Sequence, residues 1–168
     1  MISFVFALAA GSVAEQMAPA RQGMLQCQMP DHLFRTCASL SKFVATGPQT
    51  YRIETSMLVD PNGPVVVTFK SQVTVHGEEI CDKMNPADIS AASVTSAGKL
   101  LPAARAARYI ALVKRGYATL RAKEICTQIV STEQGVNKVL GRIAGKRVPK
   151  LDYDMIWVDP EDGWTVAL

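Results

Sequence analysis

The stretch 102-PAARAARYIALVKRGYATLRAKEIC-126 has the longest helical periodicity in this sequence. At 100° per residue, its apolar side chains share one arc that is wide enough to lie on a sheet. Pro102 stands at the first helical position, where its fixed φ and missing N–H do no harm. We therefore expect a helix over Pro102–Glu124 that covers a sheet. The apolar arc consists of Ala106, Tyr109, Ile110, Val113, Gly116, Tyr117 and Leu120.

The opposite side of this predicted helix is basic. Arg105, Arg108 and Arg115 lie within about 80° of one another on the helical wheel, so they form a candidate anion-binding group. A run of basic residues is also typical of a solvated helix face, and that interpretation stays open. The partner expected from this face is an unidentified protein or an anionic component of the cell envelope, and not a nucleic acid.

The clearest strands form a hairpin before the helix. Residues 51–59 and 65–76 alternate in polarity, and the segment 60-DPNGP-64 between them has the residue chemistry of a turn. Further strand-like segments lie at 125–131, 136–143 and 153–158. Asn85 followed by Pro86 indicates the start of a short helix. The expected fold class is α+β: an antiparallel sheet of about five to seven strands, packed on one long helix and stapled by disulfides.

The N-terminal residues 1-MISFVFALAAGSVA-14 are typical of a secretory signal, with small residues at the end of an apolar run. The expected organisation is therefore a signal peptide at 1–14, a flexible linker at 15–26 and a single α+β domain at 27–168. The apolar run is shorter than the ~20 residues that span a bilayer, so no transmembrane segment is expected in the mature chain. The run has no Lys or Arg before it, which leaves open a late start codon or a buried segment of a cytosolic protein.

Four cysteines follow the proposed cleavage site, and an even number in an exported chain indicates two disulfides. Of the three possible connectivities we expect Cys27–Cys37 and Cys81–Cys126. Metal binding is the weaker alternative, because no two cysteines have a C-x-x-C spacing and only His32 and His76 could join them. The expected compartment is the periplasm or the outside of the cell. No cofactor or metal is expected.

The charge is unevenly distributed, although the net charge is +3. Residues 101–150 carry 11 basic and 2 acidic residues, whereas residues 151–168 carry five acidic residues and no basic one. The simplest account is that the acidic C-terminal segment lies near the basic helix and partly neutralises it. The acidic residues could also hold calcium or act as an acid–base pair, but Asp-Pro and Asp-Gly favour turns for backbone reasons. They are Asp152, Asp154, Asp159, Glu161 and Asp162.

Nucleotide-binding, serine-hydrolase and zinc-protease motifs are absent from the sequence. The function expected is therefore a small exported protein without catalytic residues, a binding or structural component of the cell envelope. One alternative is a small hydrolase that uses His32 with Cys37 or Asp31, which requires Cys37 to be reduced. Another alternative is an inhibitor of an extracellular enzyme that presents a disulfide-held loop.

Overall fold

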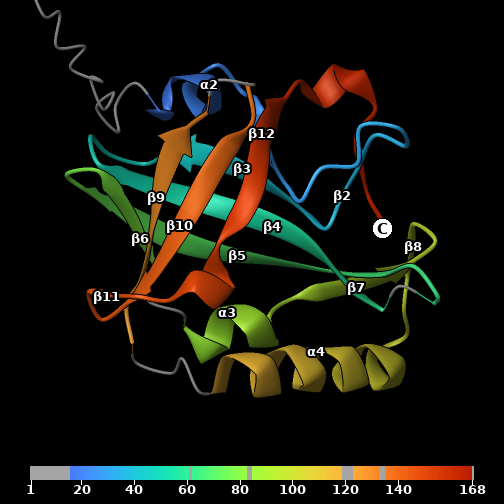
Figure 1. Ribbon diagram of the computed structural model, residues 1–168. Helices are drawn as coiled ribbons and strands as arrows, with labels where there is room; N and C mark the ends of the chain where they lie inside the picture. The colour runs from blue at the N-terminus through green and yellow to red at the C-terminus, as the bar shows by residue number, and fades with distance from the viewer. Residues whose placement is uncertain (1–15, 61, 83–84, 119–122, 133–134, 168) are drawn as a thin grey trace, which may run out of the picture.

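Strands make up half of the residues that the structure describes, and eight of them form a closed antiparallel barrel (Figure 1). The computed structural model describes residues 16–60, 62–82, 85–118, 123–132 and 135–167. In order around the barrel the strands are β1 (Leu25–Gln28), β3 (Ser39–Ala45), β4 (Thr50–Asp60), β5 (Val65–His76), β6 (Glu79–Asp82), β9 (Ile125–Ser131), β10 (Asn137–Ile143) and β12 (Tyr153–Val158). The pairing of β1 with β12 completes the ring, so none of the eight has a free edge.

The expected α+β fold is therefore wrong. The described part of the chain is 50% strand and 22% helical, and it has one helix of seven residues or more, α4 (Ala103–Ala118). A barrel buries its inner face without a covering helix, since opposite walls pack against each other. The helix instead covers one end of the barrel, below the strands in Figure 1. It ends earlier than the expected Glu124; residues 119–122 lie outside the described residues.

The β4–β5 hairpin is as long as the sequence indicates, and it extends beyond the barrel. Its far half pairs with β7 (Ser93–Ser96), which in turn pairs with β8 (Lys99–Leu100). In this half, the face of the hairpin that is continuous with the barrel interior packs against α3 (Pro86–Ser90) and α4. Asn85 caps α3 as expected, accepting a hydrogen bond from the N–H of Ala87 at 3.0 Å. This second core consists of Val65, Val67, Phe69, Ile89, Val94 and Val113, with Met57, Ala106, Tyr109, Ile110 and Tyr117 packed on it.

The opposite end of the barrel is filled by apolar side chains and covered by α2 (Ala18–Arg21). Met17 and Ala20 are buried there, and the Arg21 side chain donates a hydrogen bond to the Tyr51 hydroxyl at 3.3 Å. The segment expected to be a flexible linker, 15–26, thus carries this short helix and the start of β1 from residue 16 onward, because Met17 has an apolar site to fill. The core at this end consists of Met17, Ala20, Phe43, Tyr51, Ile53, Val73, Ile80, Ile129, Val139 and Met155. The proposed signal peptide lies outside the described residues.

Two disulfides brace the outer side of the wall, with the expected pairing. Cys81 and Cys126 face each other across β6 and β9, with their Cα atoms 4.0 Å apart. Cys27 of β1 joins Cys37 of β2 (Thr36–Cys37). Because side chains alternate along a strand, each cysteine of β1, β6 and β9 points outward between two residues that point into the barrel.

The remaining elements lie around the barrel. β2 pairs in parallel with β13 (Thr165–Val166). β11 (Lys146–Arg147) pairs with the end of β10 and leads into the 3₁₀ turn η1 (Pro149–Leu151). A second 3₁₀ turn, η2 (Pro160–Asp162), follows β12.

Candidate functional site

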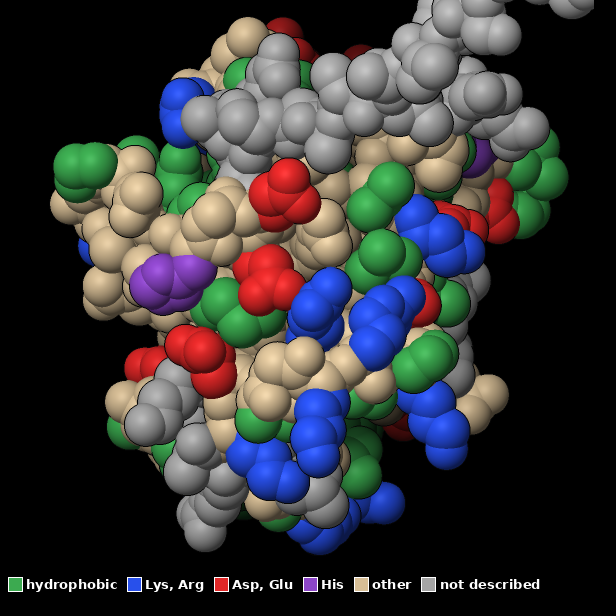
Figure 2. All heavy atoms as spheres, turned by 60° about the vertical axis from the view of Figure 1, so that its left-hand side comes forward, with side chains coloured by type: hydrophobic (Ala, Val, Ile, Leu, Met, Phe, Trp, Pro, Cys, Tyr) green, Lys and Arg blue, Asp and Glu red, His purple; other side chains and the backbone are tan. Residues whose placement is uncertain are grey.

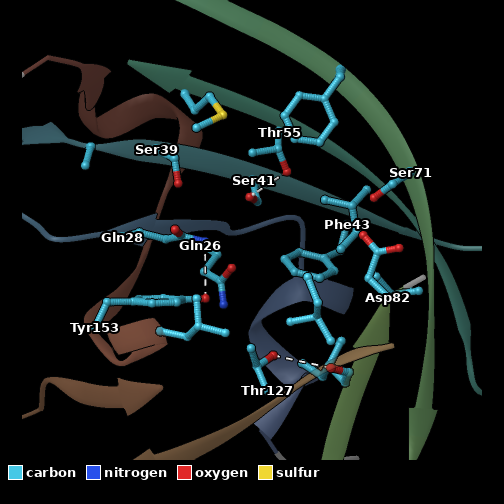
Figure 3. A pocket seen from close by; sticks show the side chains of 18 of the residues that line it. Gln26, Gln28, Ser39, Ser41, Phe43, Thr55, Ser71, Asp82, Thr127 and Tyr153 are labelled. Carbon is cyan, nitrogen blue, oxygen red and sulfur yellow. Dashed lines mark hydrogen bonds between the residues drawn. The ribbon is translucent and has the colours of Figure 1, made fainter. Parts of the chain in front are cut away.

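The barrel contains a cavity of about 360 Å³, partly open to the surface, between its two apolar cores (Figure 3). We call this space the barrel cavity. We call the end covered by α2 the apolar end, and the end that faces α4 the polar end. The cavity has an apolar floor formed by Phe43, Ile53, Val73 and Ile80. Its other lining residues are Gln26, Gln28, Ala38, Ser39, Ser41, Thr55, Met57, Leu58, Phe69, Ser71, Asp82, Tyr117, Ile125, Thr127, Leu151 and Tyr153.

Polar side chains point into the cavity from opposite walls, as Figure 3 shows. Four of them belong to residues that are buried: Gln26, Ser39, Ser41 and Ser71. They come from β1, β3 and β5, at positions whose parity along each strand directs them inward. Because a buried polar group without a partner costs free energy, the partners of these groups decide what the cavity can do.

Some of these polar groups form hydrogen bonds with each other. The hydroxyls of Ser41 and Thr55 are 3.0 Å apart, and the Gln28 amide donates to the Tyr153 hydroxyl at 3.2 Å. Thr127 donates its hydroxyl hydrogen to the carbonyl oxygen of Ile80 at 3.3 Å. These bonds hold the wall at the polar end in register.

The hydroxyl of Ser39 has hydrogen-bonding capacity left. Ser39 is 6% exposed, and its Oγ has no hydrogen-bond partner among the described residues. Gln26 is 5% exposed and lines the same cavity. A group bound in the cavity would supply the partner that the Ser39 Oγ lacks.

Asp82 is the acidic side chain of the cavity wall. Burial raises the pKa of its carboxyl, the hydrogen bond from Ser71 lowers it in part, and the nearby charge of Asp88 raises it further. Burial also raises the pKa of Tyr117, to which the charge of Asp82 adds. Burial raises the pKa of Tyr153 as well, and the charge of Tyr117 raises it further. The polar end thus holds a carboxyl and two phenols in a setting that favours their uncharged forms.

The wall beside β10 is closed by a side chain that folds over from η1. Leu151 lines the cavity, and a Cβ at Gly141 would collide with the Leu151 Cβ and lie 3.1 Å from its carbonyl oxygen. The turn is fastened by Asp152, which accepts hydrogen bonds from the N–H of Gly141 at 3.0 Å and from Arg147 at 2.5 Å. These bonds lower the pKa of Asp152. Glycine at 141 is thus required for the close approach of η1.

The basic residues singled out from the sequence lie away from this cavity. Arg105, Arg108 and Arg115 are exposed on α4. Figure 2 shows Lys and Arg side chains gathered in the lower part of the molecule, at the level where Figure 1 places α4 and β11. Anion binding by the three arginines stays a prediction.

The acidic C-terminal segment does not pair with α4 in the described residues. Asp152 pairs with Arg147, and Asp154 pairs with Lys138 at 3.4 Å. Asp159 caps η2 by accepting from the N–H of Glu161 at 2.8 Å, which agrees with the turn interpretation. In Figure 1 this red turn lies at the opposite end of the molecule from α4. Among the described residues, these carboxylates therefore make their ion pairs and cap with β10, β11 and η2, and not with α4.

The residues of the alternative hydrolase lie outside the barrel. Cys37 is fully buried in its disulfide, so it has no thiol to act as a nucleophile. Asp31 accepts hydrogen bonds from the N–H groups of Leu33 and Phe34 at 2.9 and 3.1 Å, which fixes the loop between Cys27 and Cys37. The His32 ring contacts Trp164, with ring centroids 5.8 Å apart. Glu79 lies near Cys81 and Cys126, but their sulfurs are occupied by the disulfide.

The cavity residues are the functional candidates that the sequence did not reveal. Alternation within the hairpin places Ser71 on the same face as Val67, Phe69 and Val73, and this pattern indicates that Ser71 points inward. The sequence does not indicate an inward position for Gln26, Ser39 or Asp82, because a polar residue in a short strand is equally typical of a solvent-facing position. Comparisons with protein-family models, curated proteins and solved structures find no match.

Proposed function

We propose that this protein is a small exported binding protein without catalytic residues, which holds a small molecule in the barrel cavity. The observation that carries the proposal is a cavity of about 360 Å³ with buried polar side chains aimed into it. Ligand sites are concave and mostly apolar, with a few placed polar groups, and have volumes of about 300–1,000 Å³. An eight-stranded barrel is just wide enough to hold one small ligand.

A purely structural role accounts less well for this interior. Protein cores are close-packed, and a void costs dispersion contacts and stability. The apolar end follows that rule, with large side chains such as Met155 and Ile129 fully buried. The polar end instead has Ser at inward positions 39, 41 and 71. Small side chains there leave space, and the unpartnered Ser39 Oγ adds a polar site that a structural core does not need.

Export is supported by the disulfides. Disulfide bonds form and persist in oxidising compartments such as the periplasm or the extracellular space, and all four cysteines are paired. Within the described residues, no helix combines the length and the apolar character that crossing a membrane requires. The disulfides thus support an exported location for the proposed binding protein.

The test is direct binding of an uncharged apolar dye, phenylnaphthylamine, whose fluorescence rises when it leaves water. The full-length protein should bind it saturably. Ser41→Leu should abolish binding because the larger side chain fills the cavity. Thr55→Leu, on the adjacent strand, should do the same. The matched control is Ser56→Leu, because Ser56 also bonds a threonine across the sheet, Thr68, at 2.8 Å, but its parity along β4 directs it outward. Absence of saturable binding, or equal binding by both filled variants in folded form, contradicts the proposal.

A second candidate function rests on the loop between Cys27 and Cys37. Leu33 and Phe34 are 82% and 71% exposed at its tip, and Asp31 and the disulfide fix its conformation. A rigid loop with exposed apolar side chains is suited to insertion into the cleft of an extracellular enzyme. The test is inhibition of a panel of extracellular proteases by the native protein and by a Leu33→Ser, Phe34→Ser variant. Equal inhibition by both, or none by the native protein, excludes this function.

A further inference from the structure

The charged lining of the barrel cavity has one sign. Among the described residues that line it, Asp82 is the one acidic residue, and there is no Lys, Arg or His. A carboxylate or phosphate placed in this space would therefore meet an acidic side chain and no cation. Since an ion taken out of water needs a partner of opposite charge, the lining disfavours anionic ligands.

The remaining polar groups offer acceptors to a donor-rich ligand. The carboxyl of Asp82 can accept several hydrogen bonds. The unpartnered hydroxyl of Ser39 can accept a hydrogen bond as well. An ammonium group has three donors and no acceptor, so it matches this arrangement better than a carbonyl or an ether would.

The apolar floor indicates the rest of the ligand. Phe43, Ile53 and Ile80 close the cavity toward the apolar end, and they have no polar atoms in their side chains. Figure 3 shows Asp82 and Ser71 on one wall, with Gln26, Gln28 and Ser39 on the other. A ligand seated here would have a hydrocarbon part over the floor and a polar head between the two walls.

We infer that the barrel cavity takes a small cationic amphiphile, a primary amine with a short hydrocarbon part, whose ammonium group contacts Asp82. This inference rests on the proposed binding function and specifies its ligand class. The raised pKa of Asp82 agrees with it, because burial disfavours a carboxylate that has no cationic partner. A bound ammonium group supplies that partner.

The test compares three probes of equal chain length by titration calorimetry on the full-length native protein at neutral pH: hexylamine, hexanol and hexanoate. Hexylamine should bind about 10- to 100-fold more tightly than hexanol, the range expected for hydrogen bonds to a charged group. Hexanoate should bind most weakly. This ranking tests the inference without any substitution.

A pair of variants locates the effect. Asp82→Asn should bring the affinity for hexylamine down to that for hexanol. The matched control is Asp88→Asn, which removes the neighbouring negative charge from a residue that does not line the cavity. This control should change hexylamine binding less than threefold.

The outcomes separate the inference from the proposed function. Equal binding of hexylamine and hexanol, tighter binding of hexanoate, or an Asp82→Asn variant that keeps its preference for the amine overturns the inference. If the uncharged dye still binds and Ser41→Leu abolishes that binding, the proposed function stands in each of these cases. If the dye does not bind either, the proposed function fails together with the inference.

Discussion

At the apolar end of the barrel, the opposite walls meet through large buried side chains, whereas at the polar end they are separated by the cavity. Met155, Ile129 and Val139 are fully or almost fully buried at the first. The second has inward serines and Asp82, and the wall there is crosslinked instead. Cys27 lies between the inward Gln26 and Gln28, and Cys81 lies between Ile80 and Asp82. Both disulfides thus lie on the outer side of the wall that surrounds the cavity.

The largest expected effect comes from removing a crosslink at the polar end. In the chain-entropy model, a disulfide with a separation of 45 residues, Cys81–Cys126, contributes about 4 kcal/mol, and one with a separation of 10, Cys27–Cys37, about 2.7 kcal/mol. Replacing Cys81 and Cys126 by Ala should therefore lower the free energy of unfolding more than replacing the other pair. Urea denaturation without reductant measures both. Equal or reversed losses would show that loop length does not decide the stability of this wall.

Packing at the apolar end should matter almost as much. Met155→Ala removes a side chain that is 0% exposed, and such changes cost about 2–5 kcal/mol. The matched change at the polar end is Ser41→Ala, which loses one hydrogen bond to Thr55 and should cost about 1 kcal/mol. Urea denaturation compares the two variants. Similar losses would mean that the two ends are held together in the same way.

A smaller effect is expected where η1 closes the cavity. Gly141→Ala forces Leu151 to move, which should cost about 1–3 kcal/mol, as overpacking does, and should alter dye binding. Gly116→Ala is the control, because nothing lies within 4 Å of the added Cβ on α4. It should stabilise the protein by about 0.5 kcal/mol. An unchanged affinity for the dye in folded Gly141→Ala would show that Leu151 does not shape the cavity.

The last prediction concerns the sign of a pH effect at the polar end. The pKa of Asp82 is raised in the folded protein from 3.8, so its contribution favours folding at low pH and is lost as the pH rises through the folded pKa. Asp82→Asn should therefore be more stable than the native protein at neutral pH, and the difference should vanish below about pH 3.8. Denaturation at several pH values measures it.

Asp152→Asn is the control, because its expected effect on stability at neutral pH has the opposite sign. Arg147 and the N–H of Gly141 lower the pKa of Asp152, so Asp152→Asn should lose stability at neutral pH, and this loss should disappear as the pH falls through the lowered pKa. The same sign for both variants would contradict the contrast between a carboxyl buried in the cavity wall and one held by an ion pair.

Much of the local structure could be predicted from the sequence. The hairpin was expected at 51–59 and 65–76, and it forms as β4 (Thr50–Asp60) and β5 (Val65–His76). The cap at Asn85, the packed arc of α4 with Val113 buried, and the pairing of the cysteines were also correct. The hairpin, the cap and the apolar arc depend on residues close in sequence or on side-chain periodicity, so the chain carries their signal locally. The cysteine count indicates two disulfides but leaves three connectivities.

The sequence by itself determined the β4–β5 hairpin, the capped start of α3, the helix α4 and the number of crosslinks; the tertiary structure decided that the sheet closes. Closure depends on strands far apart in sequence, such as Leu25–Gln28 of β1 and Tyr153–Val158 of β12. Short strands with polar residues do not specify their neighbours. Closure also changes the surroundings of the side chains of Gln26, Ser39 and Asp82. In an open sheet these side chains would face water, whereas in the barrel they face one another across a cavity.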